Sequence, residues 1–318
     1  MVATGTLTRQ ELYGERLEIG LPNDFKWPGS RPIAVLIGAC FEAWSEGKWP
    51  NLSPMGNPLP GGVPDINAMR YAEYGGRRGM SRILRVLHRR SARATVFVNA
   101  VAADRFPSVA RAIAAAGHDV AAHSVAQDIV PVMLDEEAEK NNIKQSIEVI
   151  KRVCGVTPSG WASPRGTPSI RSERLFAQAG LQWHADTLDD DLPYLLKLGE
   201  HSIMAIPCAM EVNDLPLHAK HGHPPYQMVR VFKDALQSLR DLGETGKIEV
   251  IIHAHVFGRP AGIWAFDEII KIAQESPDVW LTNWSDVADH ARETLTNIEQ
   301  QGERQWTSKP SVGRASPA

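Results

Sequence analysis

The sequence predicts an α/β fold in which parallel strands alternate with helices and close, fully or nearly, into a barrel. Short apolar runs of strand length are followed by segments with apolar residues at helical spacing, and this alternation recurs roughly eight times. Polar and ionisable residues directly follow most of the apolar runs. No repeat of short period is visible, which argues against a solenoid. At 318 residues and 43% hydrophobic content, the chain is long enough for one large domain with a single core.

Apolar runs and helix-terminating residues define the individual elements. The helix over 105–116 has Pro107 in its first turn, and the next helix lies between the capping residues Asp135 and Gly155. A Pro- and Gly-rich stretch at 49–64 is predicted to be a long loop, functional or disordered. We predict strands at residues 33–37, 95–98, 119–122, 160–162, 181–185, 203–206, 248–252 and 279–281. We predict helices at residues 79–89, 105–116, 135–155, 169–179, 227–242, 264–275 and 285–296.

The composition excludes several classes of partner. A net charge of −3 without blocks of Lys and Arg leaves no basic surface for nucleic acid or a membrane, so a small-molecule substrate is expected. Three widely spaced cysteines indicate neither a disulfide framework nor a Cys-based zinc site. No export signal or membrane-spanning run is recognisable, so we expect a cytoplasmic protein. We expect an N-terminal arm at 1–30, one domain at 31–298 and a disordered tail at 299–318.

Ionisable and amide side chains gather directly after the predicted strands. Because the carboxyl ends of parallel strands meet at one side of a barrel, residues from separate loops would converge there on a single site. Each residue alone has a structural alternative, such as a helix cap or a surface charge, but together they favour a site. The residues are Cys40, Glu42, Asn99, His123, Arg165, Asp186, Asp189, Asp190, Asp191, Asn213, Asp214, His253, His255 and Asn283.

Short motifs between about residues 31 and 290 carry a family resemblance. They are YGGRRG at 74–79, ATVFV at 94–98, AGHDV at 116–120 leading to His123, Gly160-Trp161 with Arg165, DDLPY at 190–194, Asn213-Asp214, and His253 with GRP at 258–260. In this order they resemble polysaccharide deacetylase-type hydrolases (carbohydrate esterase family 4), and among these the branch of allantoinases and cyclic imide hydrolases. The resemblance implies a distorted (β/α) barrel with seven to eight parallel strands, assembled as a homo-oligomer, a dimer or a tetramer.

The chain departs from the metal-dependent members of that family at defining positions. Those enzymes carry two aspartates after the first strand and a His-x-x-x-His pair after the third, whereas here the positions read Cys40, Glu42, His123 and Gln127. A thiol, one carboxylate, one imidazole and an amide make a poor site for a hard divalent ion. The allantoinase branch likewise works without a tightly bound metal. We therefore expect either no cofactor or one weakly bound divalent metal, preferably zinc, with Glu42, His123 and His255 as its ligands.

These residues suit attack by water on a carbonyl carbon, which would open a carbon–nitrogen bond of a cyclic amide, imide or ureide. Glu42 would act as general base or as a metal ligand, and His253 would protonate the leaving nitrogen. His123 would hold the water or a metal. This assignment makes Glu42, His123 and His253 the predicted catalytic residues.

A second set of residues is predicted to bind the substrate. Arg165 would donate two parallel hydrogen bonds to substrate oxygens, and Asp190 and Asp191 would accept hydrogen bonds from ring N–H groups. The set is completed by Asn213, Trp44 and His255. His255 stands where the allantoinase pattern has a basic residue, and it would either replace that residue or complete a metal site.

Alternative interpretations remain open at this point. Cys40 is either a nucleophile or a small buried residue, and the latter is the commoner fate of a free cysteine. The histidines at 218, 221 and 223 form either a solvated lid or a zinc-binding loop. Two rival functions are a metal-dependent N-deacetylase of an acetylated amine or glycan, and a catalytically silent ligand-binding barrel.

Overall fold

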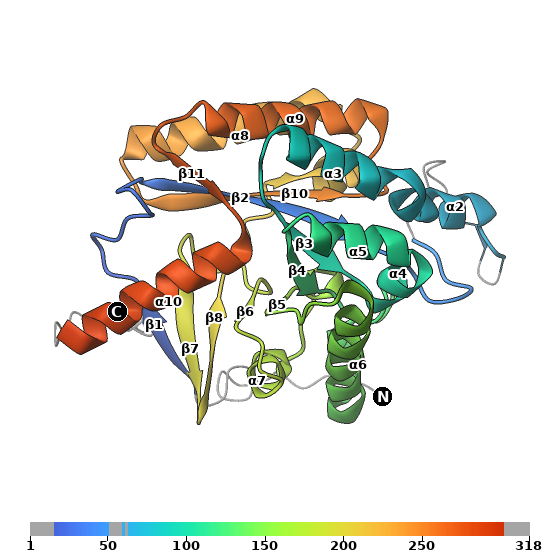
Figure 1. The fold of residues 1–318 in the computed structure, drawn as a ribbon, viewed down its shortest axis with the longest axis horizontal. Coiled ribbons are helices and arrows are strands. Elements are labelled where there is room, and N and C mark those ends of the chain that lie inside the picture. The colour runs from blue at the N-terminus through green and yellow to red at the C-terminus, as the bar shows by residue number, and fades with distance from the viewer. Residues whose placement is uncertain (1–15, 51–58, 61–62, 302–318) are drawn as a thin grey trace, which may run out of the picture.

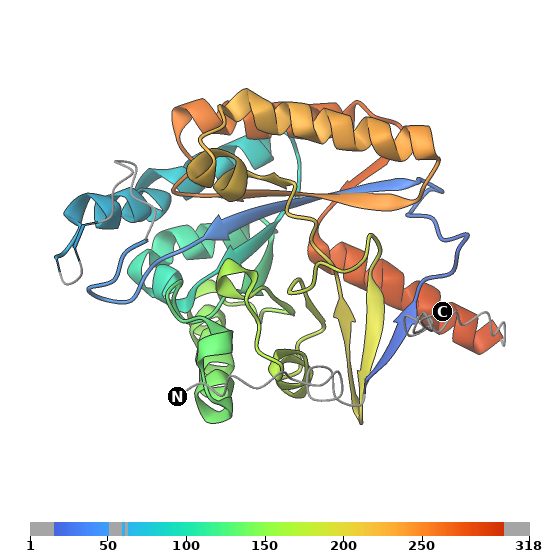
Figure 2. The ribbon, with the colours of Figure 1, turned by 180° about the vertical axis from the view of Figure 1, so that it is seen from behind.

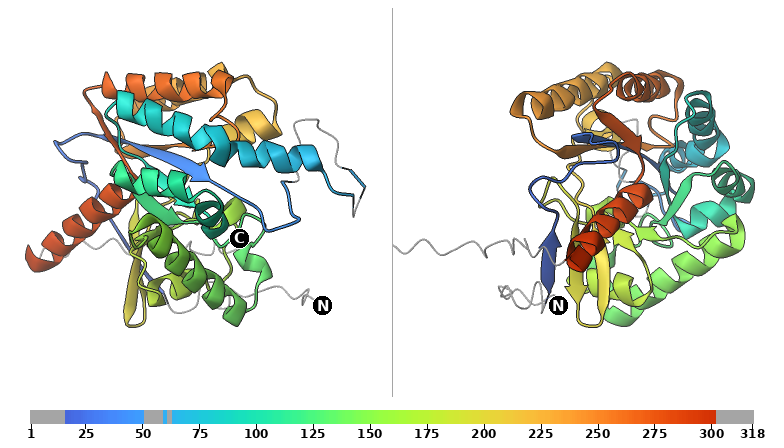
Figure 3. Two further views of the ribbon diagram at one scale, coloured as in Figure 1. Left: turned by 45° about the vertical axis from the view of Figure 1, so that its right-hand side comes forward. Right: turned by 60° about the vertical axis from the view of Figure 1, so that its left-hand side comes forward.

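A computed structural model describes residues 16–50, 59–60 and 63–301. Parallel strands, paired in one continuous order, form the centre of the fold and curve around a common interior (Figures 1 and 3). This confirms the predicted α/β class with its mostly parallel strands. Neighbouring strands follow the order β8 (His201–Ala205), β6 (Trp183–His184), β5 (Gly160–Trp161), β4 (Asp119–Ala122), β3 (Thr95–Val98), β2 (Ile33–Phe41), β10 (Gly246–His253) and β9 (Val212–Asn213).

Three further strands extend this arrangement. The strand β11 (Val279–Thr282) also pairs in parallel with β2. At the other end of the order, β7 (Tyr194–Leu198) pairs antiparallel with β8, and β1 (Leu17–Gly20) pairs antiparallel with β7 (Figure 2). The predicted N-terminal arm therefore contributes β1 to the sheet, and its Trp27 is buried at 1% exposure.

Side chains of β2 alternate between two apolar cores because successive residues of a strand point to opposite faces. Ile33, Val35 and Ile37 pack toward the helices, whereas Ala34 and Leu36 face the barrel interior. The outer layer consists of α3 (Met80–Arg89), α5 (Pro107–Ala115), α6 (Glu136–Cys154), α8 (Pro225–Leu242) and α9 (Pro260–Gln274) (Figure 1). The interior also receives Trp284, the first residue of α10 (Trp284–Gln301).

The structure corrects several predicted boundaries. The helix expected at 105–116 is α5, which begins two residues later at Pro107, and a separate helix, α4 (Ala100–Arg105), precedes it. The break falls at Phe106, whose φ of −130° and ψ of 61° are not helical. Before α3 the chain forms α2 (Ile66–Tyr74) and a π-helical segment, η1 (Gly75–Gly79). The helix predicted at 169–179 is the shorter α7 (Ser172–Gln178). Most of the predicted loop at 49–64 and of the tail at 299–318 lies outside the described residues. No described helix is both long enough and apolar enough to cross a membrane.

Candidate active site

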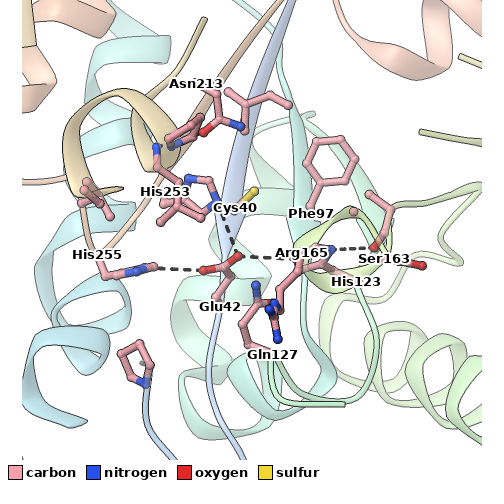
Figure 4. A pocket seen from close by; sticks show the side chains of 18 of the residues that line it. Cys40, Glu42, Phe97, His123, Gln127, Ser163, Arg165, Asn213, His253 and His255 are labelled. Carbon is pink, nitrogen blue, oxygen red and sulfur yellow. Dashed lines mark hydrogen bonds and ion pairs between the residues drawn. The ribbon is translucent and has the colours of Figure 1, made fainter. Parts of the chain in front are cut away.

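Strand register brings the predicted catalytic residues together. β10 pairs with β2 over eight positions, from Gly246 opposite Ile33 to His253 opposite Cys40, so both strands deliver their last residues to the same place. Glu42 follows β2 directly, and His123 follows β4. Figure 4 shows the Glu42 carboxylate with His123 on one side and His253 and His255 on the other.

Three imidazoles surround the Glu42 carboxylate at similar distances. Glu42 Oε1 lies 3.5 Å from His123 Nε2 and 3.6 Å from His253 Nε2, and Glu42 Oε2 lies 3.6 Å from His255 Nδ1. Burial alone would raise the pKa of Glu42, but its neighbours, the His253 imidazolium foremost, lower it to about 2. The carboxylate is therefore ionised in the resting site.

Asp214 fixes the His253 ring. The Asp214 carboxylate accepts a hydrogen bond from His253 Nδ1–H at 2.6 Å, and its other oxygen accepts from the backbone N–H groups of His253 and Phe257 at 2.9 and 3.1 Å. Burial disfavours the charged ring, but Cys40, Glu42 and Asp214 together raise the pKa of His253 well above its ordinary value. His253 is therefore an imidazolium whose Nε2–H faces Glu42.

His123 directs its Nε2 atom into the site. Its Nδ1–H donates to the Ala162 carbonyl oxygen at 2.6 Å, which leaves Nε2 as the nitrogen directed at Glu42. Within the described residues, His123 Nε2 and Glu42 Oε1 are both buried without a hydrogen-bond partner. With a neutral His123 ring, the two atoms form a pair of acceptors suited to bind one molecule that donates two hydrogen bonds, such as water.

His255 forms the opposite wall. Its ring meets the edges of Trp44 and Tyr71, with centroid distances of 5.6 and 5.7 Å. Burial lowers the pKa of His255 to about 4, although Glu42 opposes the shift. The His255 ring is therefore neutral at pH 7 and does not stabilise the Glu42 carboxylate with a positive charge.

Glycines of the YGGRRG motif support the loop that carries both histidines. A Cβ on Gly79 would lie 1.8 Å from the Ala254 carbonyl oxygen, and one on Gly75 would lie 3.3 Å from the His255 backbone nitrogen. The π-helical segment η1 therefore packs backbone to backbone against the turn between His253 and His255. This close approach explains why the motif needs glycine.

The site lines a cavity of about 730 Å³. Of the predicted substrate-binding residues, Trp44, Arg165, Asn213 and His255 line it. Asp190 and Asp191 do not: the Asp190 carboxylate accepts from the Leu192 backbone N–H at 3.1 Å, in the loop that leads to β7. The main lining residues are Cys40, Glu42, Trp44, Tyr71, Phe97, His123, Gln127, Ser163, Arg165, Asp186, Cys208, Met210, Asn213, Leu215, Lys220, His253 and His255.

Two aspartates that support the site, Asp214 and the cavity-lining Asp186, had no assigned role in the sequence-based prediction. Asp214 holds His253, and Asp186 holds Ser163 by accepting from its backbone N–H at 2.6 Å and from its hydroxyl at 2.5 Å. Asp214 follows β9 directly and Asp186 lies two residues after β6, and this position near a strand end is the signal that could have selected them. Their partners are backbone groups and side chains from distant parts of the chain, which the sequence does not reveal.

The His218–His223 segment forms part of the cavity wall without offering a metal site. Leu215, Pro216, Ala219 and Lys220 of η4 (Leu215–Lys220) line the cavity. His218 Nδ1–H instead donates to the His223 carbonyl oxygen at 2.6 Å. In the described part of the chain, these histidines do not belong to a group of donors close enough to share an ion.

One group of donor atoms could hold a metal ion, and it differs from the predicted set. Cys40, Glu42 and His253 place one donor each within 4.8 Å of one another, whereas Glu42, His123 and His255 form no such group within the described residues. The compact group fits a resident ion poorly, because burial raises the pKa of the Cys40 thiol and His253 Nε2 carries a proton. The family position for a second histidine ligand holds the Gln127 amide. The donors present therefore do not match the metal site of the deacetylases.

Comparison with known proteins places the chain in a family. A model of polysaccharide deacetylases matches residues 72–184. The crystal structure of a probable polysaccharide deacetylase from Pseudomonas aeruginosa PAO1 shares 30% identity and a TM-score of 0.75, covering 84% of this chain and 93% of that one. The structure of Puue allantoinase shares 29% identity and a TM-score of 0.75 over the same proportions. A peptidoglycan deacetylase from Helicobacter pylori is 21% identical over 248 residues, covering 68% of this chain and 84% of that protein.

The chain belongs to the polysaccharide deacetylase family, as the sequence motifs predicted. Its α/β fold is of the polysaccharide deacetylase type. The protein is accordingly a hydrolase that acts on carbon–nitrogen bonds other than peptide bonds. This membership favours an enzyme over the catalytically silent binding barrel.

Proposed function

We propose that the protein opens a carbon–nitrogen bond in the ring of a cyclic amide, imide or ureide by attack of water on the ring carbonyl. One observation carries the proposal: an ionised carboxylate, Glu42, stands between the Nε2 atom of His123 and a protonated imidazole, His253, in the wall of the cavity. This set provides an acceptor for the proton of water and a donor for the leaving nitrogen.

Water would be held by Glu42 and His123. A water that donates one hydrogen to Glu42 Oε1 and the other to His123 Nε2 satisfies both atoms and turns an oxygen lone pair toward the cavity. The two acceptor atoms are 3.5 Å apart, and a water about 2.8 Å from each fits that separation. The attacking oxygen is thereby oriented before the substrate arrives.

Proton donation by His253 to the leaving nitrogen would strengthen Glu42 as the base that takes the proton of water. The positive charge of His253 is the chief neighbouring group that lowers the pKa of Glu42. When His253 gives its proton to the leaving nitrogen, that influence disappears and Glu42 becomes a stronger base for the proton of water. Asp214 keeps the His253 ring aligned through the transfer.

The cavity favours a small ring over an extended chain. About 730 Å³ is within the range of pockets that bind small molecules, and the walls include Trp44, Tyr71 and Phe97. The similarity to Puue allantoinase supports a ureide-type substrate. Because the donor atoms do not match the deacetylase metal site, the proposed reaction needs no tightly bound metal, and no step is assigned to one.

Ring-opening assays test the proposal. Wild type, Glu42→Gln and His253→Ala would be compared on allantoin, hydantoin, dihydrouracil and succinimide, with N-acetylglucosamine oligomers as deacetylase substrates. Asp234→Asn is the matched control, because Asp234 is 71% exposed on α8. We expect ring opening by wild type and control, and a loss of about 10²- to 10⁴-fold in both site variants.

Metal content separates the proposal from its rival. Elemental analysis of purified wild type is expected to show substoichiometric zinc, with activity retained after chelation. Stoichiometric zinc that is lost in His123→Ala, together with release of acetate from the oligomers, would instead establish a metal-dependent N-deacetylase. Ring opening unaffected by both Glu42→Gln and His253→Ala would remove this site from the reaction.

A further inference from the structure

A second carboxylate in the cavity plays no part in the proposed acid–base chemistry. Asp186 follows β6, is partly buried and lines the cavity together with Ser163 and Arg165. Its two oxygens each accept one hydrogen bond from Ser163, one from the backbone N–H and one from the hydroxyl. A carboxylate has about four acceptor positions, so Asp186 keeps acceptor capacity for a group in the cavity.

The Asp186 carboxylate is held in one orientation. The Ser163 hydroxyl that donates to Asp186 also accepts from the Trp161 indole N–H at 3.0 Å, and Trp161 is fully buried. The Asp186 backbone N–H is itself fixed by His184 Nδ1 at 3.3 Å. Because both the carboxylate and the backbone of Asp186 are held by hydrogen bonds, the side chain loses little conformational freedom when it binds a ligand. This favours a role for Asp186 in substrate recognition.

Asp186 lies on the opposite side of the reacting carboxylate from the acid. Figure 4 places Ser163 and Arg165 on the His123 side of Glu42, across from His253 and His255. Asp186 is bound to Ser163 and also interacts electrostatically with His123, so it belongs to the same wall. A ring bound between the walls with its leaving nitrogen toward His253 would turn its far edge toward Asp186.

Arg165 contributes the complementary group. It is exposed, lines the cavity and adopts a left-handed backbone conformation with φ of 63°, which is uncommon for a residue other than glycine. The Arg165 guanidinium can donate hydrogen bonds to a ligand, and the Asp186 carboxylate can accept hydrogen bonds from it. This wall thus offers a donor beside an acceptor, the pattern complementary to a C=O next to an N–H.

We propose that Asp186, with Arg165, selects cyclic ureides by accepting a hydrogen bond from a second ring N–H on the side of the ring away from the leaving nitrogen. The inference rests on the proposed ring-opening function and narrows its substrate class. A cyclic ureide has two ring nitrogens, so one can leave toward His253 while the other donates to Asp186. A simple cyclic imide has only one ring nitrogen, which is the leaving nitrogen, so the Asp186 carboxylate would have no second ring N–H to accept from.

Paired substrates test this selection. The kcat/KM values for hydantoin and dihydrouracil would be compared with those for succinimide and glutarimide, and with ureides methylated on the non-scissile nitrogen. The wild-type enzyme is expected to favour the unmethylated ureides by about 10- to 100-fold, the usual strength of a hydrogen bond to a charged group. Asp186→Asn is expected to remove this preference, mainly through KM.

Two further variants keep the test decisive. Ser163→Ala leaves the Asp186 carboxylate in place but removes one of its supports, and it should weaken the ureide preference without abolishing it. Asp189→Asn is the matched control in the same loop, because Asp189 bonds to Thr187 and Tyr194 and does not line the cavity. It should keep the wild-type preference.

The outcomes distinguish this inference from the proposed function. Equal turnover of imides, methylated ureides and free ureides by wild type would overturn the role of Asp186 while leaving ring opening intact. If the enzyme opened none of the cyclic ureides or imides, the proposed function itself would be wrong. In that case, calorimetric titration of Glu42→Gln protein with hydantoin and with succinimide would still decide whether the cavity prefers a second N–H.

Discussion

Asp214 binds His253 at two points, through the ring Nδ1–H at 2.6 Å and through the backbone N–H at 2.9 Å. The same carboxylate therefore fixes both the position of the strand end and the orientation of the imidazole. Because Nδ1 is occupied, Nε2 is the nitrogen that faces Glu42. The position and the proton placement of the His253 ring are thus determined by one residue.

Asp214→Asn should lower kcat by about 10²- to 10⁴-fold with a much smaller effect on KM, because an amide neither stabilises the imidazolium nor enforces its proton placement. Steady-state kinetics on the best ring substrate would measure this. Asp267→Asn, which alters an ion pair with Arg90 on the outer surface, serves as the control. A kcat within twofold of wild type in Asp214→Asn would exclude His253 as the acid.

The buried ion pair between Lys247 and Glu249 predicts a strong, non-additive effect on stability. Lys247 Nζ lies 2.6 Å from Glu249 Oε1, Lys247 also donates to the Pro207 carbonyl, and Glu249 accepts from the Ala209 backbone N–H. The pair thereby ties the segment after β8 to β10. Lys247→Met should destabilise the fold by about 3–5 kcal/mol, because it leaves a buried carboxylate unpaired.

The double variant Lys247→Met with Glu249→Leu should recover most of that loss, since both charges are then absent. Chemical denaturation of the four proteins in the cycle measures the coupling. Additive losses in the double variant would show that the two side chains act independently, contrary to the contact seen in the structure.

Gly79→Ala should destabilise the protein by about 3 kcal/mol and lower ring-opening activity, because the added Cβ would lie 1.8 Å from the Ala254 carbonyl oxygen. Gly79 has a φ of −62°, which alanine adopts readily, so the effect is steric. Gly20→Ala is the matched control: nothing lies within 4 Å of its added Cβ. Thermal unfolding would compare them, and equal stability of the two variants would contradict the packing described.

His184 and Asp186 should give opposing pH dependences of stability. Burial lowers the pKa of His184 to about 4, so the unfolded chain takes up a proton below about pH 6.5 before the folded protein does. This costs stability as the pH falls from 6.5 to 4, by about 3 kcal/mol in total. Burial raises the pKa of Asp186 to about 6, so its contribution increases stability as the pH falls from 6 toward 3.8.

The two contributions offset each other over the shared window, and single variants should separate them. His184→Leu is expected to become relatively more stable with falling pH between 6 and 4, and Asp186→Asn relatively less stable. The free energy of unfolding at half-unit pH intervals measures both slopes. Identical pH profiles for wild type and His184→Leu would show that His184 is not held neutral in the fold.

The sequence predicted the parts of the fold that depend on local pattern. The apolar runs at 33–37, 95–98 and 248–252 became β2, β3 and β10, because continuous apolar strands are typical of a buried parallel sheet. The two-residue strand β9 was missed because so short a segment carries no period. The antiparallel pair of β1 with β7 was missed because its partners are distant in the chain.

The candidate site was predictable where it depends on strand ends. Glu42, His123, His253 and His255 follow strands that the apolar pattern reveals, and the barrel brings such ends together. Asp190 and Asp191 were expected in the cavity by the same reasoning, but they lie in the loop between β6 and β7 and do not line it. Position along a loop does not indicate which of its carboxylates turns inward.

The sequence by itself determined the fold class, the strand ends and the residue types available for chemistry, because these follow from apolar periodicity and from motif order. Only the tertiary structure decided which of these groups work together. The register of β10 against β2, the bonds from Asp214 to His253, and the support of Asp186 by Ser163 are contacts between distant segments. Such contacts depend on side-chain direction and backbone approach, and a linear sequence encodes these only through the folded chain.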